Sequence, residues 1–286
     1  MKLAIFLDVD KTITKRNIQE VYASEIGLKD EYEAIEEKFQ NKSIDSAEFG
    51  AQLIAIFAKQ KFSKTLAESF FGKVELRDGV DKLFAFVNAG VDIYLVSSGP
   101  NYYVDLLAQR KGIPADRALS SKYIFGEDGV VSKCLAVEDR DKVMFVNKNI
   151  GKYSITIGVG DNDRHDRFVD MCVIPMFMEP IEGCIHTPNF NAICTLVEGL
   201  LTVSDLDKAS AQNAGAVSAD DFKKLTVKEA ISRFSISLWM WIGGAIIAAF
   251  MTGLSADWLK PRIFGPATSV AASSSQSSGS VNRSSP

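Results

Sequence analysis

Continuous apolar runs that stop at polar residues recur along the amino-terminal two thirds of the chain. The run Leu3–Leu7 contains no alternating polar positions, which is typical of a central strand in a parallel sheet. Similar runs at Val91–Val96 and Tyr153–Val159 predict two more strands. Apolar spacing and the stop signal at a following glycine predict helices over 81–88 and 102–110. Strands that alternate with helices predict an α/β fold with a doubly wound, Rossmann-like parallel sheet.

Two further features interrupt this alternation. Residues 15–75 carry apolar stripes at helical spacing, which predicts a helical subdomain inserted into a core made of residues 1–14 and 76–202. The stretch GEDG at 126–129 lies between the strand-like KYIF and VVSK, and its Asp-Gly pair predicts a hairpin.

Beyond residue 202 the pattern changes. Residues 203–233 are polar and rich in small residues, as expected of a linker or a weak helix. Residues 234–256 contain no charge, and about 20 apolar residues suffice to cross a bilayer, so we expect a transmembrane helix there rather than a buried core helix. More Lys and Arg precede this run than follow it, which places the large amino-terminal part in the cytosol. The serine-rich residues 257–286 are expected to be disordered.

Composition excludes several classes of function. A net charge of −4 provides no basic surface for nucleic acid, so we expect no nucleic-acid partner. Four cysteines without CxxC spacing and only two histidines provide few ligands for a zinc cluster. The apolar run after Lys2 ends at Asp8, too early for the core of a secretory signal, so we expect a cytosolic catalytic part. Nothing in the sequence indicates an oligomeric state.

Polar residues whose side chains can act in catalysis or binding follow three of the predicted strands. They stand in the stretches LDVDKT, LVSSG and GVGDNDRHD. Parallel strands present their carboxyl ends at one edge of a sheet, so Asp8, Asp10 and Asp161 should converge there with Ser97. Clustered carboxylates need a cation, and oxygen ligands favour Mg²⁺, which often binds phosphate as well. A carboxylate can attack phosphorus while a lysine and a serine offset the charge of the phosphoryl oxygens.

These stretches resemble the four motifs of the haloacid dehalogenase (HAD) superfamily of phosphohydrolases, in the same order. Motif one, DxDxT, begins at Asp8, motif two is Ser97, motif three is Lys142, and motif four, GDxxxxD, spans Asp161 and Asp166. The resemblance implies that Asp8 is the nucleophile and Asp10 the general acid and base. The implied phosphate-binding residues are Ser97, Ser98, Gly99 and Lys142, and the implied Mg²⁺ ligands are Asp8, the Asp10 carbonyl, Asp161 and Asp166.

The resemblance extends to the phosphoserine phosphatase-like branch over residues 1–200. The helical insert is similar to the C1 cap of that branch, which closes over small phosphorylated metabolites. The substrate-reading acid of the branch falls at Asn17 and its cap arginine falls near Gln52 or Leu53. Because the ammonium and carboxylate of serine would need those charges, we do not expect phosphoserine itself as the substrate.

Alternatives remain open at several positions. Lys133 and Lys148 compete with Lys142, Asp163 competes with Asp166, and His165 is expected to be an ordinary loop residue. The stretch DKTIT also resembles a P-type ATPase motif in which Asp10 would be the nucleophile, but only one long apolar run is present. A phosphotransferase that uses the same aspartyl-phosphate, and a catalytically idle membrane-tethered binding module, are the other two functions considered.

Overall fold

The computed structural model describes residues 2–162, 165–181 and 184–213, with side chains described up to residue 202. Most of the predicted linker, the apolar run at 234–256 and the serine-rich tail lie outside the described residues. No helix within the described part is both apolar and long enough to cross a bilayer. The predicted transmembrane anchor is therefore untested and stays a prediction.

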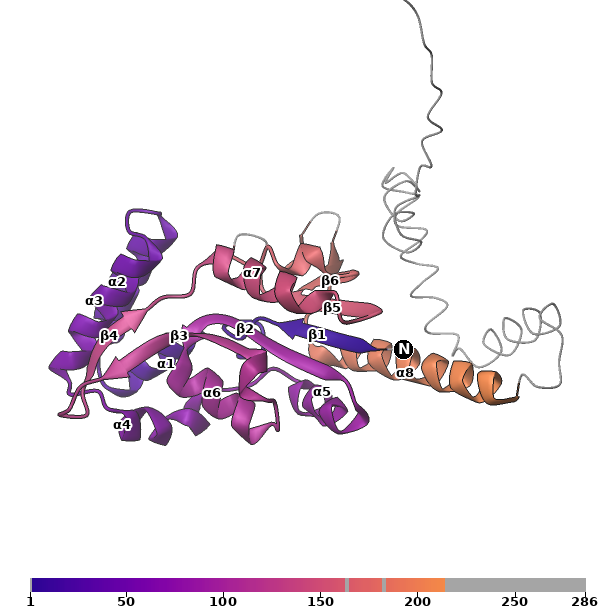
Figure 1. The fold of residues 1–286 in the computed structure, drawn as a ribbon. Helices are drawn as coiled ribbons and strands as arrows, with labels where there is room; N and C mark the ends of the chain where they lie inside the picture. The colour runs from indigo at the N-terminus through magenta and orange to yellow at the C-terminus, as the bar shows by residue number, and fades with distance from the viewer. Residues whose placement is uncertain (1, 163–164, 182–183, 214–286) are drawn as a thin grey trace, which may run out of the picture. The chain divides into compact units, whose positions relative to one another are not determined.

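Seven strands form one sheet in the order β4-β3-β2-β1-β5-β6-β7 (Figure 1). The strands are β1 (Leu3–Leu7), β2 (Asp92–Pro100), β3 (Ala118–Phe125), β4 (Val131–Leu135), β5 (Ile155–Gly160), β6 (Ile174–Phe177) and β7 (Ile185–His186). Neighbouring strands are parallel except for the β3–β4 hairpin. The predicted parallel sheet is thus confirmed, and the turn of the hairpin falls at the predicted GEDG.

Strand β1 lies at the centre of the sheet, between β2 and β5, and all five of its residues are buried. Leu3, Ile5 and Leu7 pack into an apolar cluster on one face of the sheet, whereas Ala4 and Phe6 pack into a second cluster on the other. Both faces are covered, which explains why the run shows no alternation with polar residues.

Helices cover both faces and also form the insert. They are α1 (Ile18–Glu25), α2 (Lys29–Gln40), α3 (Ser46–Lys59), α4 (Lys64–Ser69), α5 (Val80–Ala85), α6 (Asn101–Arg110), α7 (Asp139–Ile150) and α8 (Phe190–Asn213), with short 3₁₀ turns η1 (Phe71–Lys73), η2 (Phe86–Ala89), η3 (Ala115–Arg117) and η4 (Val169–Met171). Helix α7 lies on one face of the sheet, and α5, α6 and α8 lie on the other (Figure 1). This is the two-sided arrangement of a doubly wound fold.

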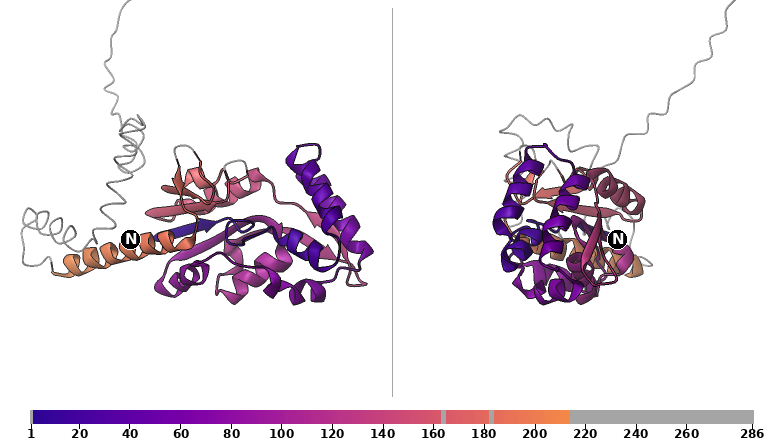
Figure 2. Two further views of the ribbon diagram at one scale, coloured as in Figure 1. Left: turned by 180° about the vertical axis from the view of Figure 1, so that it is seen from behind. Right: turned by 90° about the vertical axis from the view of Figure 1, so that its left-hand side faces the viewer.

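The helical insert consists of α1 to α4 and stands at the end of the sheet where β3 and β4 pair (Figures 1 and 2). Helix α3 packs against β4, and its first turn is capped by the Asp45 side chain, which accepts a hydrogen bond from the Glu48 N–H at 2.8 Å. The chain enters and leaves the insert through two short segments that pair at Thr14 and Leu76. The chain therefore crosses between core and insert at one pair of segments, and the insert also pairs with the hairpin at Ser63 and Val130.

Two element boundaries were not specified by the sequence pattern. Helix α8 continues through residues 203–213, the first part of the stretch expected to be a linker or a weak helix, and no glycine or proline interrupts it there. Strand β2 continues to Pro100 instead of ending at Val96. Its pairing with β3 is irregular between those two residues, which is where the expected phosphate-binding residues lie.

Candidate active site

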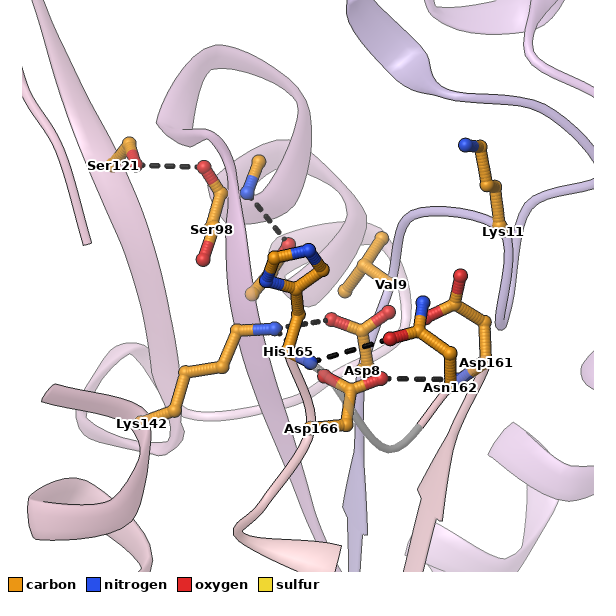
Figure 3. Close-up of polar contacts among 12 residues, drawn as sticks. Asp8, Val9, Lys11, Ser98, Ser121, Lys142, Asp161, Asn162, His165 and Asp166 are labelled. Carbon is orange, nitrogen blue, oxygen red and sulfur yellow. Dashed lines mark hydrogen bonds and ion pairs between the residues drawn. The ribbon is translucent and has the colours of Figure 1, made fainter. Parts of the chain in front are cut away.

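A buried lysine joins two of the predicted aspartates at the carboxyl end of the sheet. The Lys142 ammonium donates to Asp8 Oδ1 at 2.9 Å and to Asp166 Oδ1 at 2.8 Å (Figure 3). Asp8 directly follows β1, Lys142 lies in the first turn of α7, and Asp166 lies in the loop after β5. All three side chains are at most 5% exposed. Residues distant in the sequence therefore meet because β1 and β5 end, and α7 begins, at one edge of the sheet.

The structure also separates Lys142 from its competitors. Lys133 is exposed on β4, where it pairs with Ile124 of the hairpin, and Lys148 is exposed on α7. Neither lysine is placed among the aspartates. Of the three lysines weighed for the third motif, Lys142 is the one that contacts the carboxylate cluster.

Three carboxylates converge in an arrangement suited to a divalent cation. Asp8, Asp161 and Asp166 each offer one oxygen, and these oxygens all lie within 4.8 Å of one another. The Asp161 N–H donates to Asp166 Oδ2 at 3.1 Å, which fixes the second oxygen of that carboxylate. One lysine balances only one of the three charges. A hard cation with oxygen ligands, such as Mg²⁺, fits the remaining negative charge and the donor set.

Burial dominates the electrostatics of this cluster. Removal from water raises the pKa of Asp8 to about 7, and the neighbouring Asp166 adds to the rise while Lys142 opposes it. Burial likewise raises the pKa of Asp166 to about 7 and raises the pKa of Asp161. For Lys142, burial lowers the pKa, but the Asp166 and Asp8 carboxylates outweigh it and hold the pKa above its usual range. The lysine therefore stays charged, and the acids need further positive charge to ionise fully.

Asp10 is held differently from the other acids. Its Oδ1 accepts a hydrogen bond from the Ile18 N–H at 2.7 Å, at the beginning of α1, so its carboxylate does not belong to the group of converging oxygens. Burial raises the pKa of Asp10 to about 7; the Ile18 N–H lowers it and the charge of Asp8 raises it. An acid with a pKa near 7 can both donate and accept a proton at neutral pH.

The end of β2 forms the wall beside Asp10. Ser97 is fully buried, and its Oγ accepts a hydrogen bond from the Gly99 N–H at 2.8 Å. Ser98 is exposed, and its carbonyl oxygen accepts from Ser121 Oγ at 2.7 Å (Figure 3). A Cβ on Gly99 would lie 2.9 Å from Ser97 Oγ and closer still to the Asp10 carboxylate. Only glycine therefore fits at this position without displacing the acid.

A cavity of about 150 Å³ lies above these residues and is closed on its other side by the helical insert. Asn17, Glu36 and Phe39 line it from the insert. Leu53, one of the two positions near which the cap arginine was expected, is fully buried in the apolar core, and Gln52 does not line the cavity. The missing charge is therefore not supplied from this part of α3.

Several cavity residues were not identified from the sequence. Lys11 Nζ lies 4.0 Å from Glu36 Oε1 across the cavity, and Glu36 also accepts hydrogen bonds from Tyr32 Oη at 3.1 Å and from Gln40 Nε2 at 2.9 Å. His165, expected to be an ordinary loop residue, lines the cavity and stacks on Phe39 with ring centroids 5.9 Å apart. These side chains follow no motif, and only the position of Lys11 beside Asp10 could have suggested one of them.

Comparisons with known proteins agree on the fold. No family model matches the chain, and no curated protein matches its sequence. A substrate-bound phosphoserine phosphatase is similar over 68% of this chain and 97% of its own, with 15% identity and a TM-score of 0.57. A phosphoserine phosphatase with a phospho-aspartyl intermediate analogue is similar over 68% and 98%, with 16% identity and a TM-score of 0.56.

A third structure is a HAD family hydrolase from Salmonella enterica serovar Typhi, with 16% identity and a TM-score of 0.55. The match covers 61% of this chain and 61% of that protein, so the chain spans about three fifths of its length. At these identities the likeness concerns the fold. The chain has the fold of HAD-type phosphohydrolases, as its motifs indicated.

Proposed function

We propose that the protein is a Mg²⁺-dependent phosphatase that hydrolyses a small phosphomonoester through an aspartyl-phosphate intermediate. The observation that carries the proposal is the buried contact of Lys142 with Asp8 and Asp166, beside Asp10, at the carboxyl end of a parallel sheet. A structural ion pair would need one acid for one lysine. Here the acids outnumber the lysine, and a cavity opens directly onto Asp8, Asp10 and Asp161.

In the first half of the proposed reaction, an Asp8 oxygen forms a bond to phosphorus. The bond between phosphorus and the leaving-group oxygen breaks, and Asp10 gives its proton to that oxygen. In the second half, Asp10 takes a proton from water, the water oxygen bonds to phosphorus, and the bond to Asp8 breaks. Inorganic phosphate leaves and both carboxyl groups return to their starting states. The pKa of Asp10 near 7 suits it to both transfers.

The chain's own groups have defined tasks in this scheme. Lys142 is charged, orients Asp8 and favours its ionised form, and its ammonium offsets charge on the phosphoryl oxygens. The exposed Ser98 lines the cavity at the end of β2, along which a phosphoryl group would lie. Asp8, Asp161 and Asp166 would hold Mg²⁺ together with the Asp10 carbonyl, and the ion, when bound, supplies charge neutralisation.

The substrate is proposed to be a small phosphorylated metabolite. Two of the similar structures are phosphoserine phosphatases, but here Asn17 stands where an acid was expected, and Leu53 is buried. From the insert, the cavity instead receives one carboxylate, Glu36, which faces the Lys11 ammonium, in addition to amide side chains. A panel of phosphorylated metabolites that includes phosphoserine, phosphocholine and pyridoxal phosphate would identify the leaving group.

The reaction can be tested with purified full-length protein and p-nitrophenyl phosphate. We expect phosphate release that requires Mg²⁺ and is abolished in Asp8→Asn, whereas Asp116→Asn, an exposed aspartate remote from the cavity, retains it. Equal activity in Asp8→Asn and the unaltered protein would contradict the nucleophile assignment. Transfer of phosphate to an added alcohol in preference to water would favour the phosphotransferase.

A membrane anchor is part of the proposal and rests on the uncharged run at 234–256. The full-length chain should sediment with membranes and resist alkaline extraction, with its catalytic part accessible from the cytosol. A chain that ends at Ser232 should remain in the soluble fraction. Alkaline release of the full-length chain would contradict the anchor without affecting the enzymatic proposal.

A further inference from the structure

The loop that carries Asp10 is held by both ends of the helical insert. At the entry to the insert, the Ile18 N–H donates to the Asp10 carboxylate at 2.7 Å. At the exit, Arg77 reaches back and donates from Nε at 3.0 Å and from Nη2 at 2.7 Å to the carbonyl oxygen of Lys11. The two contacts restrain one tight turn. The first holds the Asp10 side chain, and the second holds the carbonyl of Lys11, the residue that follows Asp10.

The backbone at Lys11 explains why such a restraint is needed. Lys11 has a φ of 58°, in the left-handed region that is uncommon for residues other than glycine. Its N–H donates to Thr14 Oγ1 at 3.1 Å, so the turn directly after Asp10 is tight. Two hydrogen bonds from one guanidinium are stronger than bonds between neutral groups, and they satisfy the carbonyl that this turn directs towards the insert junction.

Arg77 is also firmly placed. It is half-buried, and its own N–H donates to the Ile13 carbonyl at 2.8 Å, within the pair of segments that join the insert to the core. It lies at the exit of the insert, so its guanidinium spans 66 positions of sequence to reach the Lys11 carbonyl. Arg77 does not line the cavity and so would not touch a substrate.

We propose that Arg77 is a positioning residue for Asp10, which fixes the acid at the point where it exchanges protons with the leaving group and with water. The inference rests on the proposed phosphatase function. It assigns to Arg77 a role in proton transfer and not in binding of the phosphoryl group, because its bonds end on the carbonyl of Lys11, next to Asp10, and Arg77 does not line the cavity. Loss of the restraint should therefore affect the steps that need Asp10 and spare those that do not.

p-Nitrophenyl phosphate separates these steps. Its leaving group departs as a stable anion, so formation of the aspartyl-phosphate, which kcat/KM reports, needs no proton from Asp10. Hydrolysis of the aspartyl-phosphate still needs Asp10 as a base. For Arg77→Met we expect kcat to fall by about 10- to 100-fold, a fall in KM of similar size, and kcat/KM within about threefold of the unaltered enzyme.

A rapid-quench measurement provides a second readout. When hydrolysis limits turnover, p-nitrophenolate appears in a burst equal to the concentration of active sites, followed by a slow steady rate. We expect this burst in Arg77→Met. Arg77→Lys keeps the charge but loses the fork of two donors, so its kcat should lie between those of Arg77→Met and the unaltered enzyme.

Arg117→Met is the matched control. Arg117 is also half-buried and also makes a charge-assisted contact, 2.6 Å to Asp92 Oδ1, but at the start of β2, away from the site. Its kcat and KM per folded molecule should be unchanged. If Arg77→Met fails to fold, Arg77→Lys and Arg77→Gln carry the same test.

Two outcomes overturn the inference. If kcat and kcat/KM fall equally in the Arg77 variants, with KM unchanged and no burst, Arg77 only supports the folded state. If the Arg77 variants match Arg117→Met, the contact is dispensable. In both cases the phosphatase proposal stands. Absence of Asp8-dependent activity in the unaltered protein would reject both proposals together.

Discussion

The two walls of the cavity are built in different ways. On the core side, Asp8, Lys142 and Asp166 are buried and joined by contacts of 2.8 and 2.9 Å. On the insert side, Glu36 lies 4.0 Å from Lys11 of the loop after β1, with the two side chains 19% and 44% exposed. The core wall is formed at the ends of parallel strands, whereas the insert wall is formed by helices. The carboxylate cluster is buried and paired, and the insert wall, which would face the leaving group, is more exposed.

This difference predicts that substitutions on the core wall have the largest effects. Lys142→Met leaves Asp8 and Asp166 buried without their cation, which should destabilise the fold by about 3–5 kcal/mol. The loss should be smaller at pH 5.5, where protonation removes the uncompensated charges. Phosphatase activity should fall at least ~10²-fold. Denaturant unfolding at both pH values is the measurement, and the exposed Lys148→Met on the same helix is the control.

A smaller effect is expected where the core wall meets Asp10. Gly99→Ala places a Cβ against the Asp10 carboxylate and Ser97 Oγ, so the acid must move. We expect kcat to fall by about 10- to 100-fold with little loss of stability. Gly151→Ala is a suitable control because a Cβ there meets nothing within 4 Å. Unaltered kcat in Gly99→Ala would show that Asp10 is not held where the structure has it.

Mg²⁺ should stabilise the protein more at high pH than at low pH. An aspartate has an ordinary pKa of 3.8, and burial raises the pKa of Asp8 and Asp166 to about 7 in the metal-free fold. Between pH 4 and pH 7 the unfolded chain loses protons that the fold retains, so the free energy of unfolding falls as the pH rises. Mg²⁺ binds the ionised carboxylates and offsets this loss.

The measurement is the shift in Tm on adding Mg²⁺, taken at pH 5.5 and at pH 8. A shift of several degrees at pH 8 and little shift at pH 5.5 is expected. Asp161→Asn, which removes one of the three converging carboxylates, should weaken the shift at pH 8. An equal shift at both pH values in the unaltered protein would show that the ion binds elsewhere.

The smallest effect is expected on the insert wall. Glu36→Gln removes the charge that faces Lys11 but keeps acceptor and donor atoms for Tyr32 and Gln40. Stability should change by less than ~1 kcal/mol, and kcat/KM should change by less than about tenfold and differently for each substrate. The exposed Glu37→Gln is the control on the same helix. A uniform large loss across substrates would place Glu36 in the chemistry and remove the contrast between the walls.

The parallel sheet and the convergence of its carboxyl-end acids could be predicted because local sequence encodes them. A short, continuous apolar run such as Leu3–Leu7 favours a strand that is covered on both faces. Acids at the carboxyl end of such a strand lie close to those of neighbouring parallel strands. Asp8, Asp161 and Asp166 converge for that reason.

Other features depended on packing between distant segments. The choice of Lys142 over Lys133 and Lys148 required knowing which lysine the first turn of α7 places among the acids. The contacts of Glu36, His165 and Arg77 arise where the insert meets the core, and no local pattern specifies them. Strand ends are placed by repeating backbone geometry, so the sequence determined the convergence of the acids. The insert wall joins helices and loops by single side-chain contacts, and only the tertiary structure decided it.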